Sequence, residues 1–120
     1  MLVKQIPIRN NLKNYMYLIA CEKTLETIAI DPLDHALCLK TAEGLGWSIK
    51  IVANTHHHHD HIGGNDQVIQ ATGAQLVAHT EAMKAIPNVD RGLNAGDVLK
   101  CGELVLEIMD TPGHTMSHIC

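Results

Sequence analysis

Apolar and polar positions alternate over the first thirty residues in a pattern that predicts three β-strands. Leu2–Ile8 and Asn14–Cys21 are apolar runs joined by a polar turn around Asn10 and Asn11, and Thr27–Ile30 is ended by Asp31 and Pro32. Short apolar runs bounded by turn residues are typical of strands. We expect the three segments to pair as a meander.

Helical and extended patterns alternate over the middle of the chain. Asp34 is placed to cap a helix that continues through about Leu45, and Gly44 and Gly46 are available to end it. The elements expected next are a buried strand over Ile49–Ala53, a helix from Asn65 or Asp66 to Gly73, and a short strand over Gln75–Ala78. This β-α-β-α-β order predicts an α/β fold with strands and helices in separate layers.

The last third of the chain returns to an extended pattern. A strand at Val98 and Leu99 is followed by a turn at Cys101 and Gly102, and Glu103–Met109 then places every second apolar residue on one face. No repeat, low-complexity run or linker divides the sequence. We therefore expect a single domain over residues 1–120.

Composition narrows the classes of protein to which the chain can belong. With 46% hydrophobic and 18% charged residues in 120, the sequence is that of a globular domain. A net charge of −4 provides no basic surface for nucleic acid, and no apolar run approaches the roughly 20 residues of a membrane span. The four cysteines form no C-x-x-C pair and no signal peptide opens the chain, so we expect a cytoplasmic protein with free thiols.

Nine histidines, against three Trp and Tyr residues, indicate that imidazole serves chemistry here. The densest group, Thr55–Gly64, follows the expected buried strand. His56 and His58 lie two residues apart and point to one side of an extended segment, whereas Asp60 and His61 follow in a turn. Imidazoles suit zinc, iron or another borderline divalent ion, and the carboxylate favours a second ion. The motif lies between a strand end and a glycine-rich loop, which is where α/β sheets place their sites. The ligand spacing predicts two metal ions at this place.

A second histidine motif, Thr111–His118, follows the last expected strand. His114 lies in a Pro-Gly turn that lets the backbone approach a site closely, and we expect it to complete a three-histidine site with His56 and His58. For the other histidines we expect a structural hydrogen bond at His118, positions behind the ligands or in solvent for His57 and His59, and surface or capping positions for His35 and His79. A solvated histidine-rich loop or a tag remnant fits poorly, because the first motif is embedded between a buried strand and a capped helix.

Together these motifs resemble the H-x-H-x-D-H signature of the metallo-β-lactamase fold and, within it, glyoxalase II, the hydroxyacylglutathione hydrolases. The residues that carry the resemblance are Asn14–Ile19, Ile30–Pro32, Thr55–Asn65, Gly96–Asp97, Thr111–Thr115 and His118–Cys120. The resemblance implies that His56, His58 and His114 hold one metal and that Asp60 and His61 hold the other. It also implies that Asp31 is the buried carboxylate that braces the metal loop.

The resemblance further implies an αββα sandwich of roughly twice this length, of which the chain would form the N-terminal half, a mixed sheet with flanking helices. The carboxylate that bridges the two ions and the last histidine of the second ion are then expected beyond Cys120. Ser117, where the family usually has Gly, and Lys13, where it often has Asp, depart from the pattern at positions that touch no ligand. We accordingly expect a partial metal-binding domain whose apolar sheet face is left uncovered and favours self-association.

For activity, the resemblance implies a zinc-dependent hydrolase that cleaves S-2-hydroxyacylglutathione thioesters to glutathione and a 2-hydroxy acid, a step of methylglyoxal detoxification. Two divalent ions, zinc with iron or manganese as substitutes, lower the pKa of a shared water toward about 7, so a metal-bound hydroxide attacks without a protein nucleophile. The thiolate leaves readily because a free thiol has a pKa of about 8.5. The alternatives are other enzymes of the scaffold, namely a persulfide dioxygenase, a lactonase or a β-lactamase, and a non-catalytic metal-binding fragment.

Overall fold

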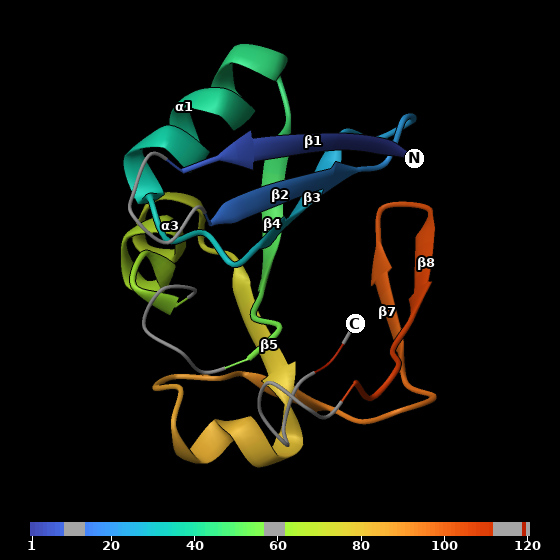
Figure 1. The fold of residues 1–120 in the computed structure, drawn as a ribbon. Coiled ribbons are helices and arrows are strands. Elements are labelled where there is room, and N and C mark those ends of the chain that lie inside the picture. Colours follow the sequence, from blue (N-terminus) through green and yellow to red (C-terminus); the bar gives the residue numbers. More distant parts are fainter. Residues whose placement is uncertain (9–13, 57–61, 112–118, 120) are drawn as a thin grey trace.

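A computed structural model describes residues 1–8, 14–56, 62–111 and 119 and shows the layered α/β arrangement (Figure 1). The strands are β1 (Leu2–Pro7), β2 (Tyr15–Ala20), β3 (Glu26–Ile30), β4 (Ser48–Ala53), β5 (Gln75–His79), β6 (Arg91–Leu93), β7 (Val98–Cys101) and β8 (Leu104–Glu107). The helices are α1 (His35–Leu45), α3 (Asn65–Thr72) and the 3-10 helix η1 (Thr80–Lys84). The first six strands form one sheet in the order β1-β2-β3-β4-β5-β6, and β7 pairs with β8 in a second sheet.

The larger sheet is mixed, and its first three strands form the predicted meander. β1 pairs antiparallel with β2, and β2 pairs antiparallel with β3, with Leu18 opposite Ala29. From β3 onward the neighbours pair in parallel, through β4 and β5 to β6. The carboxyl ends of these parallel strands therefore meet at one edge of the sheet, which is where open α/β sheets place ligand sites.

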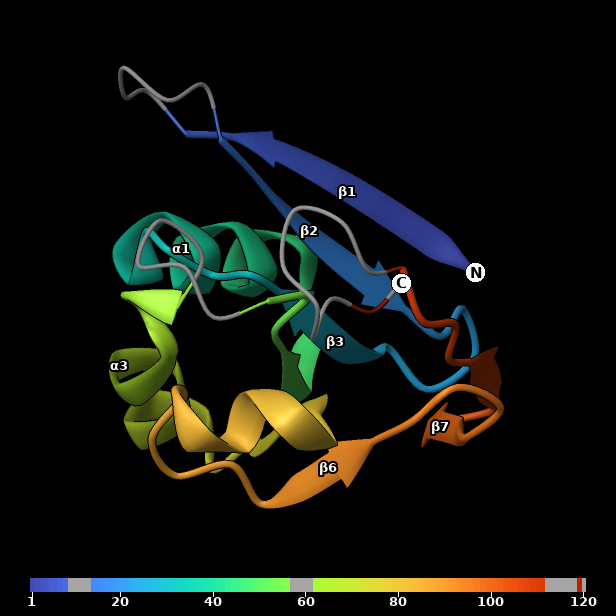
Figure 2. The ribbon, with the colours of Figure 1, turned by 60° about the horizontal axis from the view of Figure 1, so that its bottom comes forward.

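Helix α1 begins and ends at signals that the sequence carries, and α3 ends at one. Asp34 Oδ1 accepts the Leu37 N–H at 3.1 Å, which caps α1, and Gly46 ends this helix with φ +71°. Gly73 ends α3 in the same left-handed conformation. The two helices cover one face of the larger sheet (Figures 1 and 2), where they bury a core that includes Met16, Leu18, Cys38, Ala42, Val52, Val68 and Leu76.

The β7–β8 hairpin covers part of the opposite face of the larger sheet. The buried residues between the two sheets are Ile28, Ile51, Val77, Leu93, Leu99, Cys101, Ile108 and Ile119. An apolar cavity of about 250 Å³, lined by residues such as Ile30, Ala53 and Leu106, remains between them. The expectation of an uncovered sheet face is therefore wrong beneath the hairpin, because the alternate apolar residues of β7 and β8 supply a partner for it.

Three details differ from the sequence prediction. The 3-10 helix η1 directly follows β5, and the three-residue strand β6 pairs in parallel with β5. The sequence pattern predicts neither element, because elements this short show no hydrophobic periodicity. Leu45, whose helical spacing from Leu37, Cys38 and Ala42 predicts a place on one apolar face, is 42% exposed, since it is the last residue of α1.

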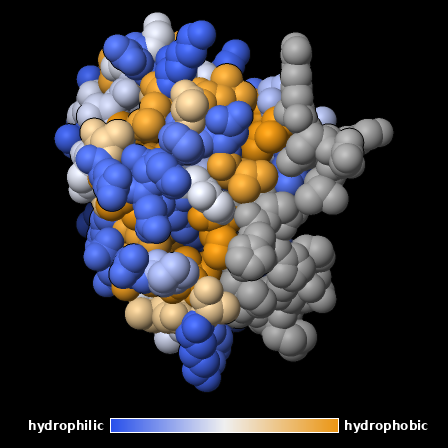
Figure 3. Space-filling model, turned by 90° about the vertical axis from the view of Figure 1, so that its left-hand side faces the viewer, coloured by the Kyte–Doolittle hydropathy of each residue, from blue (hydrophilic) through white to orange (hydrophobic). Residues whose placement is uncertain are grey.

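The side of the molecule on which α1 and α3 lie is predominantly hydrophilic, with apolar side chains showing between the polar ones (Figure 3). None of the helices in the described ranges has the length and apolar character that a membrane crossing requires.

Candidate metal centre

Several of the described residues to which the sequence assigns a role lie at the carboxyl edge of the parallel strands. Asp31 directly follows β3, Asn54 to His56 directly follow β4, and His79 is the last residue of β5. Because β4 lies between β3 and β5, the first histidine motif begins at the middle of this edge. The prediction that the motif follows a buried strand is confirmed, with Val52 fully buried and Asn54 1% exposed.

Asp31, Thr55 and His56 form a continuous chain of polar contacts at this edge. Asp31 is 4% exposed and has a positive φ of 49°, a conformation uncommon for a residue other than glycine. Its carboxylate accepts two hydrogen bonds from Thr55, from the backbone N–H at 2.9 Å and from the hydroxyl at 2.6 Å. The same hydroxyl oxygen lies 2.9 Å from Nδ1 of His56. The strained turn after β3 thus aims a buried carboxylate at the residue before His56.

These contacts fix the tautomer of His56. The only proton of the Thr55 hydroxyl is donated to Asp31, so the hydroxyl oxygen accepts from His56, and Nδ1 carries the ring proton. Nε2 then has the lone pair, as a histidine that binds a metal requires, while the other ring nitrogen donates to an oxygen behind it. The imidazole of His56, which is 2% exposed, is therefore oriented and protonated as a metal ligand would be.

Two further contacts hold the segments that flank residues 57–61. The buried side chains of Asn54 and Asn65 exchange a pair of amide hydrogen bonds, at 3.1 and 2.6 Å, which ties the end of β4 to the start of α3. Gly64 packs against the Asp31–Pro32 turn so closely that a Cβ there would overlap the Pro32 carbonyl oxygen. The ends of the first histidine motif are thus anchored to each other and to the turn after β3.

The residues on either side of the second histidine motif are anchored near His56. The Ile119 N–H donates to the Thr55 carbonyl oxygen at 3.0 Å, and Ile119 forms an antiparallel bridge with Asp110. Residues 110 and 119 stand on either side of His114 in the sequence. The two points from which the motif departs and returns are therefore both held at the edge that carries His56.

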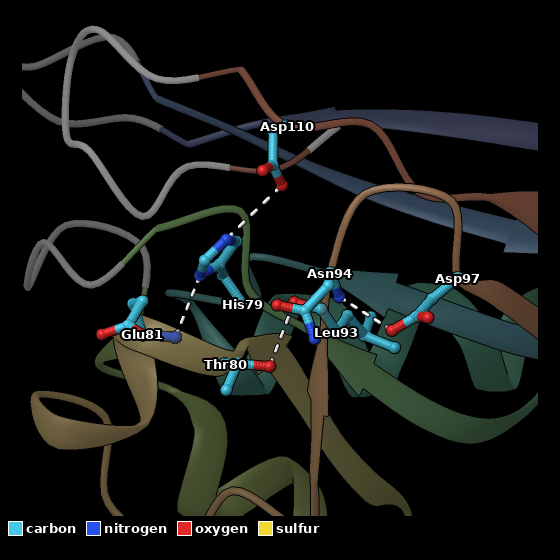
Figure 4. Close-up of polar contacts among 7 residues, drawn as sticks. All are labelled: His79, Thr80, Glu81, Leu93, Asn94, Asp97 and Asp110. Atoms are coloured by element: carbon cyan, nitrogen blue, oxygen red, sulfur yellow. Dashed lines mark hydrogen bonds and ion pairs between the residues drawn. The ribbon is translucent and has the colours of Figure 1, made fainter.

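His79 also lies at this edge, and its ring proton is on the other nitrogen from that of His56. Its Nδ1 accepts the Glu81 N–H at 2.9 Å, so the ring proton is on Nε2, which lies 3.4 Å from Asp110 Oδ1 (Figure 4). The prediction of a capping role is confirmed, because this contact caps η1. Of the two predicted kinds of position, surface or capping, His79 takes the capping one and is only 8% exposed, whereas His35 lies at the surface.

Most of the predicted ligands lie outside the described residues. These are His58, Asp60, His61 and His114, together with the other motif histidines His57, His59 and His118. Of the predicted site residues the structure places His56 and Asp31, which Thr55 joins. Within the described ranges, no three His, Cys, Asp or Glu side chains gather as a metal site would require.

The cysteines within the described part of the chain, Cys21, Cys38 and Cys101, are free thiols, as expected. Hydrogen bonds from the Thr24 side chain and from the Glu103 backbone N–H lower the pKa of Cys21 to about 7. The second of these joins Glu103 N to Cys21 Sγ at 3.4 Å and links the β7–β8 turn to the end of β2. Burial raises the pKa of both Cys38 and Cys101 to about 11.

Comparison with known proteins gives the site a family. A model of the Metallo-beta-lactamase superfamily matches residues 20–120. A hydroxyacylglutathione hydrolase of Polaromonas sp. (strain JS666) is 58% identical over all of this chain, and one of Nitrosococcus oceani is 50% identical, also over all of it. The chain spans 46% of the length of each of these two relatives.

The fold agrees with that of solved structures. The crystal structure of ETHE1 from Myxococcus xanthus matches with a TM-score of 0.86 and 30% sequence identity, over 99% of this chain and 52% of that one. The expected mixed sheet with flanking helices is thereby confirmed as part of this fold. With its family model, its fold and the histidine motif at the end of β4 in agreement, the chain belongs to the metallo-beta-lactamase superfamily.

Proposed function

We propose that the chain is the metal-binding part of a hydrolase that cleaves S-2-hydroxyacylglutathione thioesters to glutathione and a 2-hydroxy acid. The observation that carries the proposal is the chain of contacts Asp31–Thr55–His56, which gives His56 the tautomer of a metal ligand. The relatives from Polaromonas and Nitrosococcus, both named hydroxyacylglutathione hydrolases, support the choice of substrate.

The ligands follow from the two motifs and their anchoring. We assign His56, His58 and His114 to one ion, and Asp60 and His61 to a second ion. Support for the first set comes from the hydrogen bond between Ile119 and Thr55, which returns the second motif to the residue beside His56. Three imidazoles with an open fourth position suit zinc in a catalytic site, and iron or manganese would accept the same ligands.

The protein residues prepare the site, and the metal supplies the reactivity. When bound, a divalent ion lowers the pKa of a coordinated water and polarises a carbonyl oxygen, which is the chemistry that thioester hydrolysis needs. Asp31 and Thr55 hold the His56 ring in one orientation and keep the proton on Nδ1. The Asn54–Asn65 pair and Gly64 hold the residues on either side of the first motif close to each other and to the turn after β3.

Zinc titration of the chain tests the site assignment. We expect one tight site in the wild-type chain, and its loss in the variant His56→Ala/His58→Ala/His114→Ala. Asp60 and His61 alone supply too few ligands for a second tight ion, so the stoichiometry should be nearer one than two. Equal zinc affinity in the wild-type chain and the triple variant would refute the assignment.

The substrate class is tested separately, with S-lactoylglutathione and a β-lactam offered to the zinc-loaded chain. We expect slow thioester hydrolysis that disappears in the triple variant, and no turnover of the β-lactam. Turnover of the β-lactam alone would show that the ligands are right and that the substrate class is wrong.

A further inference from the structure

We propose that His79 is a positioning residue for the metal centre. Through Asp110 it fixes the point from which the second histidine motif departs at the end of β5, the sheet edge where His56 lies. The inference rests on the proposed metal centre, and assigns a role to a histidine that the ligand motifs do not include.

The geometry of His79 excludes it as a ligand in the tautomer that its contacts require. Its Nδ1 is engaged by the Glu81 N–H at 2.9 Å, and the ring proton on Nε2 faces Asp110 Oδ1 at 3.4 Å. A nitrogen that carries a proton has no lone pair to give a metal. The same ring therefore has two fixed partners, one at the start of η1 and one at the start of the second histidine motif (Figure 4).

Asp110 is connected to the ends of two strands of the larger sheet, directly to β5 and through Ile119 to the residues after β4. Its side chain contacts His79 at the end of β5, and its backbone forms the bridge to Ile119. Ile119 in turn donates to Thr55, directly after β4 and directly before His56. His114 stands four residues after Asp110 and five before Ile119. The His79 contact fixes one end of this eight-residue connection, and the bridge closes it.

Fixing the ends of a connection reduces the number of conformations in which its ligand is away from the metal. The conformational entropy lost when His114 binds is then smaller, which raises metal affinity without any contact to the metal. Partners that contact a ligand directly change metal affinity by about 10- to 100-fold. Asp110 acts through the backbone and its side chain is 47% exposed, so we expect an effect of about 3- to 10-fold.

Two substitutions break the contact in different ways. His79→Asn keeps an oxygen that accepts the Glu81 N–H, because Asn is itself a preferred helix cap, but it does not reach Asp110. Asp110→Ala removes the carboxylate at a half-exposed position and leaves the His79 cap intact. Glu81→Gln is the matched control, since it neutralises an exposed neighbouring carboxylate and keeps the backbone N–H that His79 accepts.

The experiment measures zinc affinity of the full chain by competition with a chromophoric chelator, in the wild-type background and in a His114→Ala background. We expect His79→Asn and Asp110→Ala each to weaken zinc binding about 3- to 10-fold in the wild-type background. The double variant should be no weaker than either single variant, and Glu81→Gln should leave the affinity unchanged. In the His114→Ala background, neither substitution should alter zinc affinity further, because the ligand on which they act is gone.

Each contrary outcome has a distinct meaning. Unchanged affinity in both single variants would overturn the positioning role and leave the metal centre standing. Equal losses in both backgrounds would overturn it as well, because His79 would then act on the fold and not through His114. The unfolding free energy of the metal-free variants, measured alongside, identifies such a general loss. If His114→Ala alone left zinc affinity unchanged, the proposed centre would fail and this inference with it.

Discussion

The substitution Gly64→Ala is expected to destabilise the protein and the metal centre together. Gly64 precedes α3, with φ −101°, so alanine can adopt its backbone conformation without strain. The cost is entirely steric. A Cβ at this position would overlap the Pro32 carbonyl oxygen and lie 2.8 Å from the Leu33 carbonyl oxygen. Both are backbone atoms, which cannot move aside as the end of a flexible side chain can.

The expected magnitude follows from what must move. Relief of the overlap requires the start of α3 to separate from the Asp31–Pro32 turn, which disturbs the packing of Val68 and the Asn54–Asn65 pair. Overpacking of a dense core usually costs 1–3 kcal/mol, and a clash between two backbone segments lies at the top of that range, so we expect a loss of about 3 kcal/mol or more. Since Asp31 adjoins Pro32, zinc affinity should fall as well.

A matched control is available in α1. Gly44 lies in this helix at an exposed position, and a Cβ there meets no atom within 4 Å. Gly44→Ala should therefore stabilise the protein by about 0.5 kcal/mol, through the lower flexibility of the unfolded chain. Urea denaturation followed by circular dichroism measures both changes. If Gly64→Ala altered the unfolding free energy by less than about 1 kcal/mol, the close packing between α3 and the turn would be refuted.

Three other outcomes are expected. Thr55→Val removes the hydroxyl that orients the first histidine ligand and should weaken zinc binding about 10-fold, whereas Thr55→Ser keeps a hydroxyl and should bind zinc as the wild type does. Equal zinc affinities of Thr55→Val and the wild type in a chelator competition would contradict this. Asn54→Ala removes the partner of the buried Asn65 amide and should lower the free energy of unfolding by about 2 kcal/mol in urea denaturation. The further loss on adding Asn65→Ala should be smaller than this first loss. The pKa of Cys21 is lowered to about 7, so its thiolate absorbance should appear near that pH and be absent in Cys21→Ser, whereas Cys38 ionises only near 11. The ordinary pKa of the thiol is 9.0, so ionisation of Cys21 stabilises the folded protein fully above pH 9, and this contribution is lost as the pH falls through about 7. Urea denaturation across this pH range should show the trend in the wild-type chain and not in Cys21→Ser.

The sequence predicts the larger elements because their signals are local. The alternation in β2 and the caps of α1 lie within the elements themselves, so Asp34 and Gly46 could be recognised as boundaries without the fold. The short strand β6 and the 3-10 helix η1 exist because of contacts with β5, and no local pattern marks them. Prediction fails here because tertiary pairing decides whether segments this short become regular structure.

The site shows the same division. The ligand spacing in the first motif is a local signal, and so is its position after a strand. The role of Thr55 is not local, because it depends on Asp31, 24 residues earlier, and on Ile119, 64 residues later. The contact of His79 with Asp110 is not local either, because the two residues are 31 positions apart in the sequence. Residues that position others are recognised only when the fold has brought their partners together.

Thr55 shows why the two motifs form one unit. Its N–H and hydroxyl both donate to Asp31, its hydroxyl oxygen accepts from His56, and its carbonyl oxygen accepts from Ile119. One residue thus joins the turn after β3, the first histidine ligand and the end of the second motif. Two of these contacts use the backbone and survive any substitution that keeps the backbone in place. Thr55→Val therefore removes only the contacts that orient the ring, so its effect on zinc affinity isolates the tautomer of His56 from the placement of the segments around it.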